Sequence, residues 1–285
     1  MLSKPNIVFF GTPDRAVIAL DVLQKNGIVP ALIITQPDRP SGRKLVLTPP
    51  PVKVWAESNN IPCLQPNDLS HPDFIKTLTD GKFDVFVVVA YGKILKSDIL
   101  TIPKFGSINL HASLLPALRG SCPIETAILT NTRETGATII LMDEKMDHGP
   151  ILAQKKVILS RWPLPADELA NSIVRDGGEL LAQTILELIK GTIIPQEQNH
   201  TLATYTKKIV KEDGRIDLQA DPYKNWLAYN AYKSWPGSFF FIEQNGKKTR
   251  ITITDAVFEN GQFIIKKIIP EGKKEMDYTE FSILK

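Results

Sequence analysis

Short, almost unbroken apolar runs recur through the first half of the chain and constrain its fold more than any other feature. Residues 6–11, 31–35 and 84–90 are such runs, rich in valine, isoleucine and phenylalanine. Runs of this kind are typical of strands buried on both faces, as in a parallel sheet. Amphipathic stretches suited to helices separate them, for example residues 16–24. The alternation predicts an α/β fold with helices on both faces of a mostly parallel sheet.

A long helix and then a strand-rich segment follow this alternating region. Residues 166–190 have helical character, with acidic residues near the start and Gly191 just after the end. The glycine pair at 177–178 inside this helix is typical of a kink. Farther on, Asn-Gly dipeptides at 245–246 and 260–261 each separate two strand-like runs, as hairpin turns do. Short strands at this spacing predict a small β-barrel or sandwich.

The domain organisation follows from these patterns. A length of 285 residues is compatible with one large domain or two ordinary ones. We expect a Rossmann-like α/β domain over residues 1–190, a linker over 191–207 and a compact β domain over 208–285. The net charge of +3 falls entirely in residues 201–285, which contain 14 basic and 11 acidic residues. This excess is a weak indication of contact with a polyanion, and a solvated surface explains it equally well.

Composition excludes several classes of protein. Hydrophobic residues make up 43% and charged residues 23% of the chain, as in globular proteins and unlike disordered or fibrous ones. The two cysteines, Cys63 and Cys122, have no partners at metal-ligand spacing, so we expect neither a disulfide scaffold nor a metal site. No apolar run approaches the roughly 20 residues that span a bilayer. We therefore expect a soluble, cytoplasmic protein that does not contact membranes.

The segment from Ser107 to Gly120 carries the strongest chemical signal. Asn109 and His111 are two residues apart, so on a strand their side chains point to the same face. Pro116 and Gly120 then force the chain to turn, and strand ends are where open α/β sheets bind ligands. An amide beside an imidazole is a candidate catalytic pair. The spacing alone favours a simpler explanation, a partly buried histidine that caps a loop.

Two loops are further candidates for a functional site. Residues 142–150 place three carboxylates and a histidine between two predicted strands, and a carboxylate there is suited to orient a histidine or accept a proton. Their spacing alone favours an ordinary acidic turn. Residues 35–53 form a long, proline-rich connection that includes Arg39, Arg43 and Lys44. Basic residues on such a loop suit phosphates, although a solvated irregular loop fits the pattern equally well.

These segments, taken in order, resemble the signature motifs of the methionyl-tRNA formyltransferase family. The resemblance covers residues 6 to about 240. Its motifs are Gly11-Thr-Pro-Asp14, Gln36-Pro-Asp-Arg-Pro40, Ala90-Tyr-Gly-Lys-Ile-Leu95, Asn109-Leu-His-Ala-Ser-Leu-Leu-Pro116, Arg119-Gly120, Met142-Asp143 with Asp147, Lys211-Glu-Asp-Gly-Arg-Ile-Asp217 and Trp235-Pro-Gly237. The Asn-x-His core is shared with other 10-formyltetrahydrofolate-dependent enzymes. The Gln-Pro-Asp-Arg-Pro and Asp-Gly-Arg-Ile-Asp segments indicate the tRNA enzyme.

The resemblance implies a reaction and three catalytic residues. A formyl group would pass from 10-formyltetrahydrofolate to the α-amine of methionine on initiator tRNA, for translation initiation. Asn109 and protonated His111 would hydrogen-bond the negatively charged oxygen of the tetrahedral intermediate. Asp147 would hold His111 and accept or relay the amine proton. Which of His111 and Asp147 is the immediate base stays open.

Binding residues are also implied by the resemblance. The co-substrate 10-formyltetrahydrofolate is expected to contact Ser113, Leu114, Leu115, Pro116, Ala90, Tyr91, Gly92, Asp143 and Met146. The tRNA is expected to bind the basic loop through Arg39, Arg43 and Lys44. The C-terminal domain, implied to be an OB-like barrel, would contact the body of the tRNA, which suits its positive charge. We expect a monomer.

The chain departs from the family pattern at several places. Lys145 and His148 stand where glycine and threonine are usual, the basic loop carries fewer charges, and the C-terminal domain is short. Two other functions are therefore kept as alternatives. A formyltransferase acting on an amino-sugar nucleotide is disfavoured by residues 36–43 and 213–217. A non-catalytic RNA- or folate-binding paralogue is disfavoured by the intact set of three catalytic residues.

Overall fold

The computed structural model describes residues 4–42, 45–244 and 246–283, and the chain forms two compact units. The N-terminal unit contains the chain up to Arg119 together with Thr135–Val157 and Ala170–Tyr205. The C-terminal unit contains Gly120–Glu134, Ile158–Leu169 and the chain from Thr206 onward. The boundaries expected at residues 190 and 208 stay predictions.

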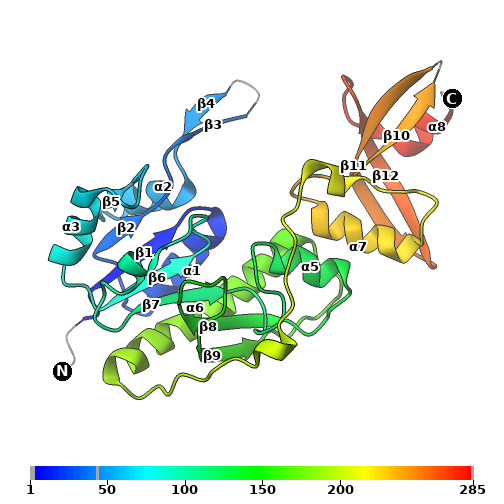
Figure 1. Ribbon diagram of the computed structural model, residues 1–285. Coiled ribbons are helices and arrows are strands. Elements are labelled where there is room, and N and C mark those ends of the chain that lie inside the picture. Colours follow the sequence, from blue (N-terminus) through cyan, green and yellow to red (C-terminus); the bar gives the residue numbers. More distant parts are fainter. Residues whose placement is uncertain (1–3, 43–44, 245, 284–285) are drawn as a thin grey trace. The chain divides into compact units, whose positions relative to one another are not determined.

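A seven-stranded mixed sheet forms the centre of the N-terminal unit (Figure 1). Its strand order is β5-β2-β1-β6-β7-β8-β9, in which the five strands from β5 to β7 are parallel and β8 and β9 are antiparallel. The strands are β1 Ile7–Gly11, β2 Leu32–Ile34, β5 Cys63–Leu64, β6 Val85–Val89, β7 Ser107–His111, β8 Gly136–Leu141 and β9 Ile151–Lys156. The predicted Rossmann-like, mostly parallel sheet is therefore confirmed.

Both faces of this sheet are covered by helices, which explains the unbroken apolar runs. Every residue of β1 and β6 is buried. Alternate residues of β1 enter different apolar clusters: Ile7 and Phe9 pack with α1, α2 and α6, whereas Val8 and Phe10 pack with α3 and α4. These helices are α1 Asp14–Lys25, α2 Pro51–Ser58, α3 Pro72–Asp80, α4 Ser97–Leu100 and α6 Ala166–Lys190.

The glycine pair in α6 marks a close approach between elements. The helix assignment runs through Gly177 and Gly178 without a break. A Cβ added to Gly177 would lie 2.8 Å from the Cβ of Ala137 on β8, and one added to Gly178 would lie 3.0 Å from the Cβ of Val22 on α1. The pair thus lets α6 pack tightly against the sheet and α1, although glycine is unfavourable inside a helix.

The C-terminal unit contains a small antiparallel sheet of order β10-β11-β12-β13. Its strands are β10 Phe239–Gln244, β11 Lys247–Glu259, β12 Gln262–Pro270 and β13 Met276–Asp277, and its helices are α5 Pro123–Leu129, α7 Pro222–Tyr232 and α8 Tyr278–Ile283. Both expected hairpins are confirmed, with the runs at 249–254 and 256–258 joined in one long strand, β11. Among the described residues the pairings do not close the sheet on itself, so the OB-like barrel stays a prediction.

The segment between α6 and α7 contains little regular structure. It includes two single 3-10 turns, η1 His200–Leu202 and η2 Lys211–Gly214. Isolated β-bridges join this segment to Arg119, Ile151 and Phe239. None of the helices in the described part of the chain combines the length and apolar character of a membrane span.

Candidate active site

The three predicted catalytic side chains meet where β7 ends. Asn109 and His111 stand on β7, and Asp147 lies in the loop that joins β8 to β9. The Oδ1 atom of Asp147 is 3.5 Å from Nδ1 of His111 and 3.5 Å from Nδ2 of Asn109. Both side chains are largely shielded from solvent, since those of His111 and Asp147 are 6% and 14% exposed. Catalytic contacts of this length commonly shorten in the complex with substrate.

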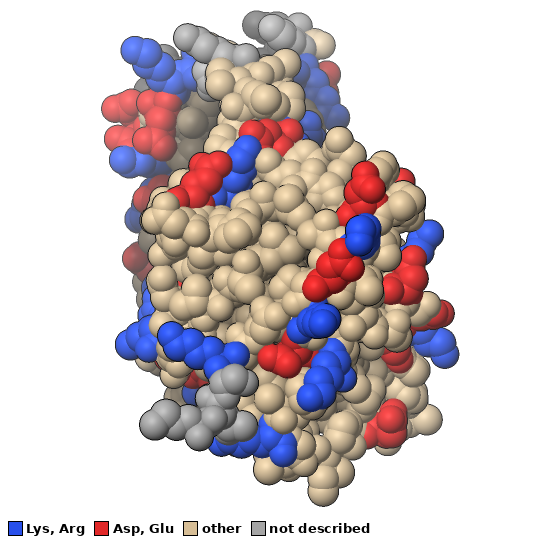
Figure 2. Space-filling model, turned by 90° about the vertical axis from the view of Figure 1, so that its left-hand side faces the viewer, with Lys and Arg blue, Asp and Glu red and all other residues tan. Residues whose placement is uncertain are grey.

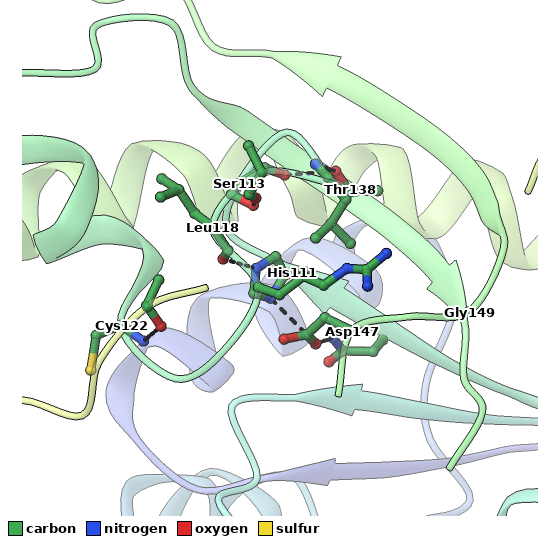
Figure 3. Close-up of polar contacts among 12 residues, drawn as sticks. His111, Ser113, Leu118, Cys122, Thr138, Asp147 and Gly149 are labelled. Atoms are coloured by element: carbon green, nitrogen blue, oxygen red, sulfur yellow. Dashed lines mark hydrogen bonds and ion pairs between the residues drawn. The ribbon is translucent and has the colours of Figure 1, made fainter. Parts of the chain in front are cut away.

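A backbone carbonyl determines which nitrogen of His111 can exchange a proton. Nε2 of the ring lies 2.9 Å from the carbonyl oxygen of Leu118, as Figure 3 shows. A carbonyl only accepts hydrogen bonds, so Nε2 must carry a hydrogen. The neutral ring therefore has its lone pair on Nδ1, the atom that faces Asp147. Leu118 itself has φ 60°, in the left-handed region, as the chain folds back after Pro116.

The loop that carries Asp147 is held by the side chain of Asp143 and by a close approach to β8. Asp143 Oδ1 accepts the backbone N–H of Lys145 at 3.0 Å, and its Oδ2 lies 2.6 Å from Nδ1 of His148. A Cβ at Gly149 would overlap the carbonyl oxygen of Leu141, so the loop turns tightly against β8. Lys145, which stands where the family has glycine, is exposed and is not among the residues with positive φ. The loop thus accommodates both departures from the family pattern.

The Ser113–Pro116 turn is held from beneath by β8 and β9. Thr138 Oγ1 donates to the carbonyl of Ser113 at 2.6 Å and accepts the N–H of Leu115 at 3.1 Å. Gln154 Nε2 donates to the carbonyl of Leu115 and to Thr138 Oγ1, both at 2.9 Å. Thr138 is fully buried. Sequence reasoning missed Thr138 and Gln154, because a threonine and a glutamine on a strand carry no chemical signal by themselves.

The loop after β6 exposes its backbone at the surface, while the aromatic side chain of Tyr91 within it is buried. Ala90 and Gly92 are exposed and have positive φ, whereas Tyr91 is 2% exposed. The Tyr91 ring packs edge-on against Phe10 at 5.5 Å, and burial raises the pKa of its hydroxyl to about 12. Its carbonyl accepts from Thr12 Oγ1 and Gln36 Nε2. The predicted contact of Tyr91 with a ligand is thus limited to its backbone.

The remaining predicted folate-binding residues lie on the same loop as Asp147. The side chain of Asp143 is 38% exposed and is engaged by His148. Met146 is 57% exposed, so its side chain is accessible to a ligand. Among the described residues, no group of three histidine, cysteine, aspartate or glutamate side chains is arranged to hold a metal ion.

The predicted basic loop forms a two-stranded ribbon. Strands β3 Arg39–Ser41 and β4 Val46–Thr48 pair antiparallel and are exposed along their length (Figure 1). Arg39 donates to Gln36 Oε1 at 2.5 Å. Arg43 and Lys44 lie outside the described residues. On the face drawn in Figure 2, acidic side chains lie among the basic ones over much of the surface.

An ion pair ties the base of this ribbon to α2. Lys53 Nζ lies 2.9 Å from Asp38 Oδ2, and Gln65 Nε2 donates to Asp38 Oδ1 at 2.7 Å. Hydrogen bonds from Gln65 and Lys53 lower the pKa of Asp38, and the bond to Asp38 raises the pKa of Lys53. Lys53 is therefore already paired within the N-terminal unit.

The Thr138 contacts lead to a stability prediction. Thr138→Val keeps the shape of the side chain but leaves the Ser113 carbonyl and the Leu115 N–H without their partner, which costs about 1–3 kcal/mol for each buried group. The free energy of unfolding, measured with denaturant, should fall accordingly. Thr35→Val is the matched control: Thr35 is also fully buried, but its hydroxyl has no hydrogen-bond partner among the described residues. That change should be neutral or stabilising, and equal losses in both variants would contradict the role assigned to Thr138.

Comparison with known proteins identifies the family. The family model described as formyl transferase matches residues 5–185. The chain is 44% identical to the methionyl-tRNA formyltransferase of Chloroflexus aurantiacus, over 82% of this chain and 76% of that protein. It is 37% identical to the enzyme of the same name from Geobacillus sp., over 96% of this chain and 93% of that one.

Solved structures agree in fold. The methionyl-tRNA formyltransferase of Clostridium thermocellum aligns with a TM-score of 0.61 and 18% identity over 96% of this chain and 99% of that one. An N-formyltransferase from Helicobacter canadensis aligns with a TM-score of 0.64 and 19% identity, over 90% of this chain and 89% of that one. The family match and the sequence identities place the chain among the formyl transferases, and it belongs to the methionyl-tRNA formyltransferase family.

Proposed function

We propose that this protein transfers the formyl group of 10-formyltetrahydrofolate to the α-amine of methionyl initiator tRNA, a step of translation initiation. One observation carries the proposal: Asn109, His111 and Asp147 meet within 3.5 Å at the end of β7, in a chain of this family. The set supplies two hydrogen-bond donors and one carboxylate, which are the groups that acyl transfer to an amine requires.

Each of the three side chains has a role that its position supports. The neutral amine nitrogen bonds to the formyl carbon, and the formyl oxygen becomes negatively charged. Asn109 Nδ2 and protonated His111, through Nδ1, donate hydrogen bonds to that oxygen. The Asp147 carboxylate accepts the proton that the amine loses when His111 is protonated; when the ring is neutral, Nδ1 of His111 accepts that proton instead. The formyl oxygen then re-forms its carbonyl bond as the bond from the formyl carbon to N10 breaks, and N10 takes up the proton that the amine lost, so tetrahydrofolate leaves.

The co-substrate is proposed to bind three segments around this set of residues. The turn Ser113, Leu114, Leu115 and Pro116 offers a surface made rigid by Thr138 and Gln154. The loop at Ala90, Tyr91 and Gly92 contributes backbone, and Asp143 and Met146 contribute side chains. A comparable ligand occurs among the structural neighbours, since the Helicobacter canadensis structure is described as a complex with folinic acid and an amino-sugar nucleotide.

The tRNA is proposed to bind through the β3–β4 ribbon and the C-terminal unit. Arg39, Arg43 and Lys44 supply positive charge for phosphates, and the C-terminal residues carry the net charge of the chain. We propose an OB-like fold for residues 208–285, within the division 1–190, 191–207 and 208–285. We also propose that the protein acts as a monomer in the cytoplasm.

A formylation assay tests the reaction and the acceptor together. The wild-type protein should transfer formyl from 10-formyltetrahydrofolate to charged initiator tRNA and should leave an amino-sugar nucleotide unmodified. His111→Ala should lower kcat by about 10²–10⁴-fold, the usual contribution of a group that transfers protons. His71→Ala is the matched control, because His71 is an exposed residue at the N-terminus of α3. Formylation of the sugar alone, or full activity of His111→Ala, would contradict the proposal.

Binding of tRNA by the ribbon is tested separately. Arg39→Ala and Arg43→Ala should each raise KM for charged tRNA more than KM for formyl-folate, and should reduce the salt dependence of tRNA binding by about one phosphate contact. Arg175→Ala, on the exposed surface of α6, removes the same charge elsewhere and serves as the control. Equal changes of both KM values in the ribbon variants would show that the ribbon is not a tRNA contact.

A further inference from the structure

We infer that Gln198 is a positioning residue of this reaction, which holds the backbone at Asp147 and thereby sets its carboxylate against His111. The inference rests on the proposed function of that carboxylate. Gln198 lies in the irregular segment after α6, and its chemistry gives no hint of a catalytic contribution. It is 5% exposed, so its amide must find partners inside the protein.

The amide nitrogen of Gln198 donates both of its hydrogens to the loop between β8 and β9 that carries Asp147. Nε2 donates to the carbonyl of Asp147 at 2.9 Å and to the carbonyl of Gly149 at 2.7 Å. These two bonds hold the backbone of the loop at the residues before and after His148. Asp147 has φ 50°, in the left-handed region that a side-chain-bearing residue keeps only where its surroundings hold it there. The bonds from Gln198 are such a restraint, applied at the residue whose carboxylate faces Asn109 and His111.

A buried arginine fixes the orientation of that amide. Arg119 is 1% exposed, and its Nη2 donates to Gln198 Oε1 at 2.6 Å. Because a guanidinium only donates, the amide oxygen must face Arg119 and the amide nitrogen must face the loop. The same Nη2 donates to His200 Nδ1 at 2.9 Å, and Nη1 donates to Tyr205 Oη at 3.3 Å. Arg119 is thus held in place by three residues. A flipped Gln198 amide would direct its nitrogen, a donor, at the Arg119 donor, so this orientation is disfavoured.

The catalytic consequence follows from the distances at Asp147. Its carboxylate acts on Nδ1 of His111 and Nδ2 of Asn109 across 3.5 Å. A shift of the loop by about 1 Å is enough to lower a rate by roughly 100-fold when the group concerned transfers a proton. Gln198 and Arg119 touch none of the reacting atoms, so their effect passes through Asp147.

The variant Gln198→Glu tests this effect. Glutamate keeps the shape of the side chain and its contact with Arg119, now as an ion pair, but loses both donors to the Asp147 and Gly149 carbonyls. We expect kcat for formyl transfer to fall by about 10- to 100-fold, with KM for charged tRNA and for formyl-folate little changed. Gln24→Glu is the matched control, since Gln24 is an exposed residue of α1 whose amide contacts only Asn59 among the described residues. It should retain wild-type kcat.

A double-mutant cycle separates positioning from a general structural role. In the Asp147→Ala background, Gln198→Glu should cause no further loss of kcat, because the group that it positions is gone. Losses that multiply, or a Gln198→Glu enzyme with wild-type kcat, would overturn the inference. Thermal melting checks that each variant folds. If Gln198→Glu does not fold, Gln198→Met removes the same donors without adding a charge and carries the same expectation.

Amide hydrogen exchange distinguishes failure of this inference from failure of the proposed function. Exchange over residues 142–150 should be faster in Gln198→Glu than in the wild type and unchanged in Gln24→Glu, whatever the formyl acceptor is. Unchanged exchange in Gln198→Glu would overturn the inference even if the wild type formylates tRNA. Faster exchange in a protein that formylates no tRNA would contradict the proposed function alone.

Discussion

Burial of the sheet on both faces leaves the ends of its strands as the place for polar chemistry. In β7, Ile108 and Leu110 pack into the same apolar cluster as Ile7, while the alternate residues Asn109 and His111 face the other way. The imidazole of His111 is nevertheless buried, so it must be hydrogen-bonded. The Leu118 carbonyl meets that requirement and, in doing so, settles which nitrogen of the ring faces Asp147. The chemistry we propose depends on this one bond.

The site is assembled from backbone as much as from side chains. Leu118 and Asp147 both have positive φ, and neither conformation is stable without support from elsewhere in the fold. For Asp147 that support comes from the amide of Gln198, and for the neighbouring turn at Ser113 it comes from Thr138 and Gln154. A small number of buried amide and hydroxyl groups thus holds the turn after β7 and the loop that carries Asp147 to segments that are distant in sequence.

Local patterns were sufficient to predict most of the elements and part of the site. The buried strand at 84–90, the helix at 166–190 and the hairpins at 245–246 and 260–261 were visible, because periodicity and turn residues act over short distances. The two-residue spacing of Asn109 and His111 placed them on one face. It did not reveal catalysis, and only the resemblance to a family connected them to Asp147.

The features that were missed depend on contacts between distant segments. Gln198 bonds to a residue 51 positions away, and no spacing rule reports such a pair. The Leu118 carbonyl is a backbone atom and has no signature at all. The ring of Tyr91 is buried beside Phe10, a contact between β1 and the loop after β6, while the expected ligand contact of Tyr91 stays a prediction. The glycine pair in α6 was interpreted as a kink because its packing partners, Ala137 and Val22, lie on other elements.

The most direct test of this account is the protonation state of His111, measured by nitrogen-15 NMR across its titration. We expect neutral His111 to carry its hydrogen on Nε2, bonded to the Leu118 carbonyl, and the added proton of the charged form to appear on Nδ1. A neutral ring with its hydrogen on Nδ1 would contradict the account, because the proton-exchanging nitrogen would then face away from Asp147.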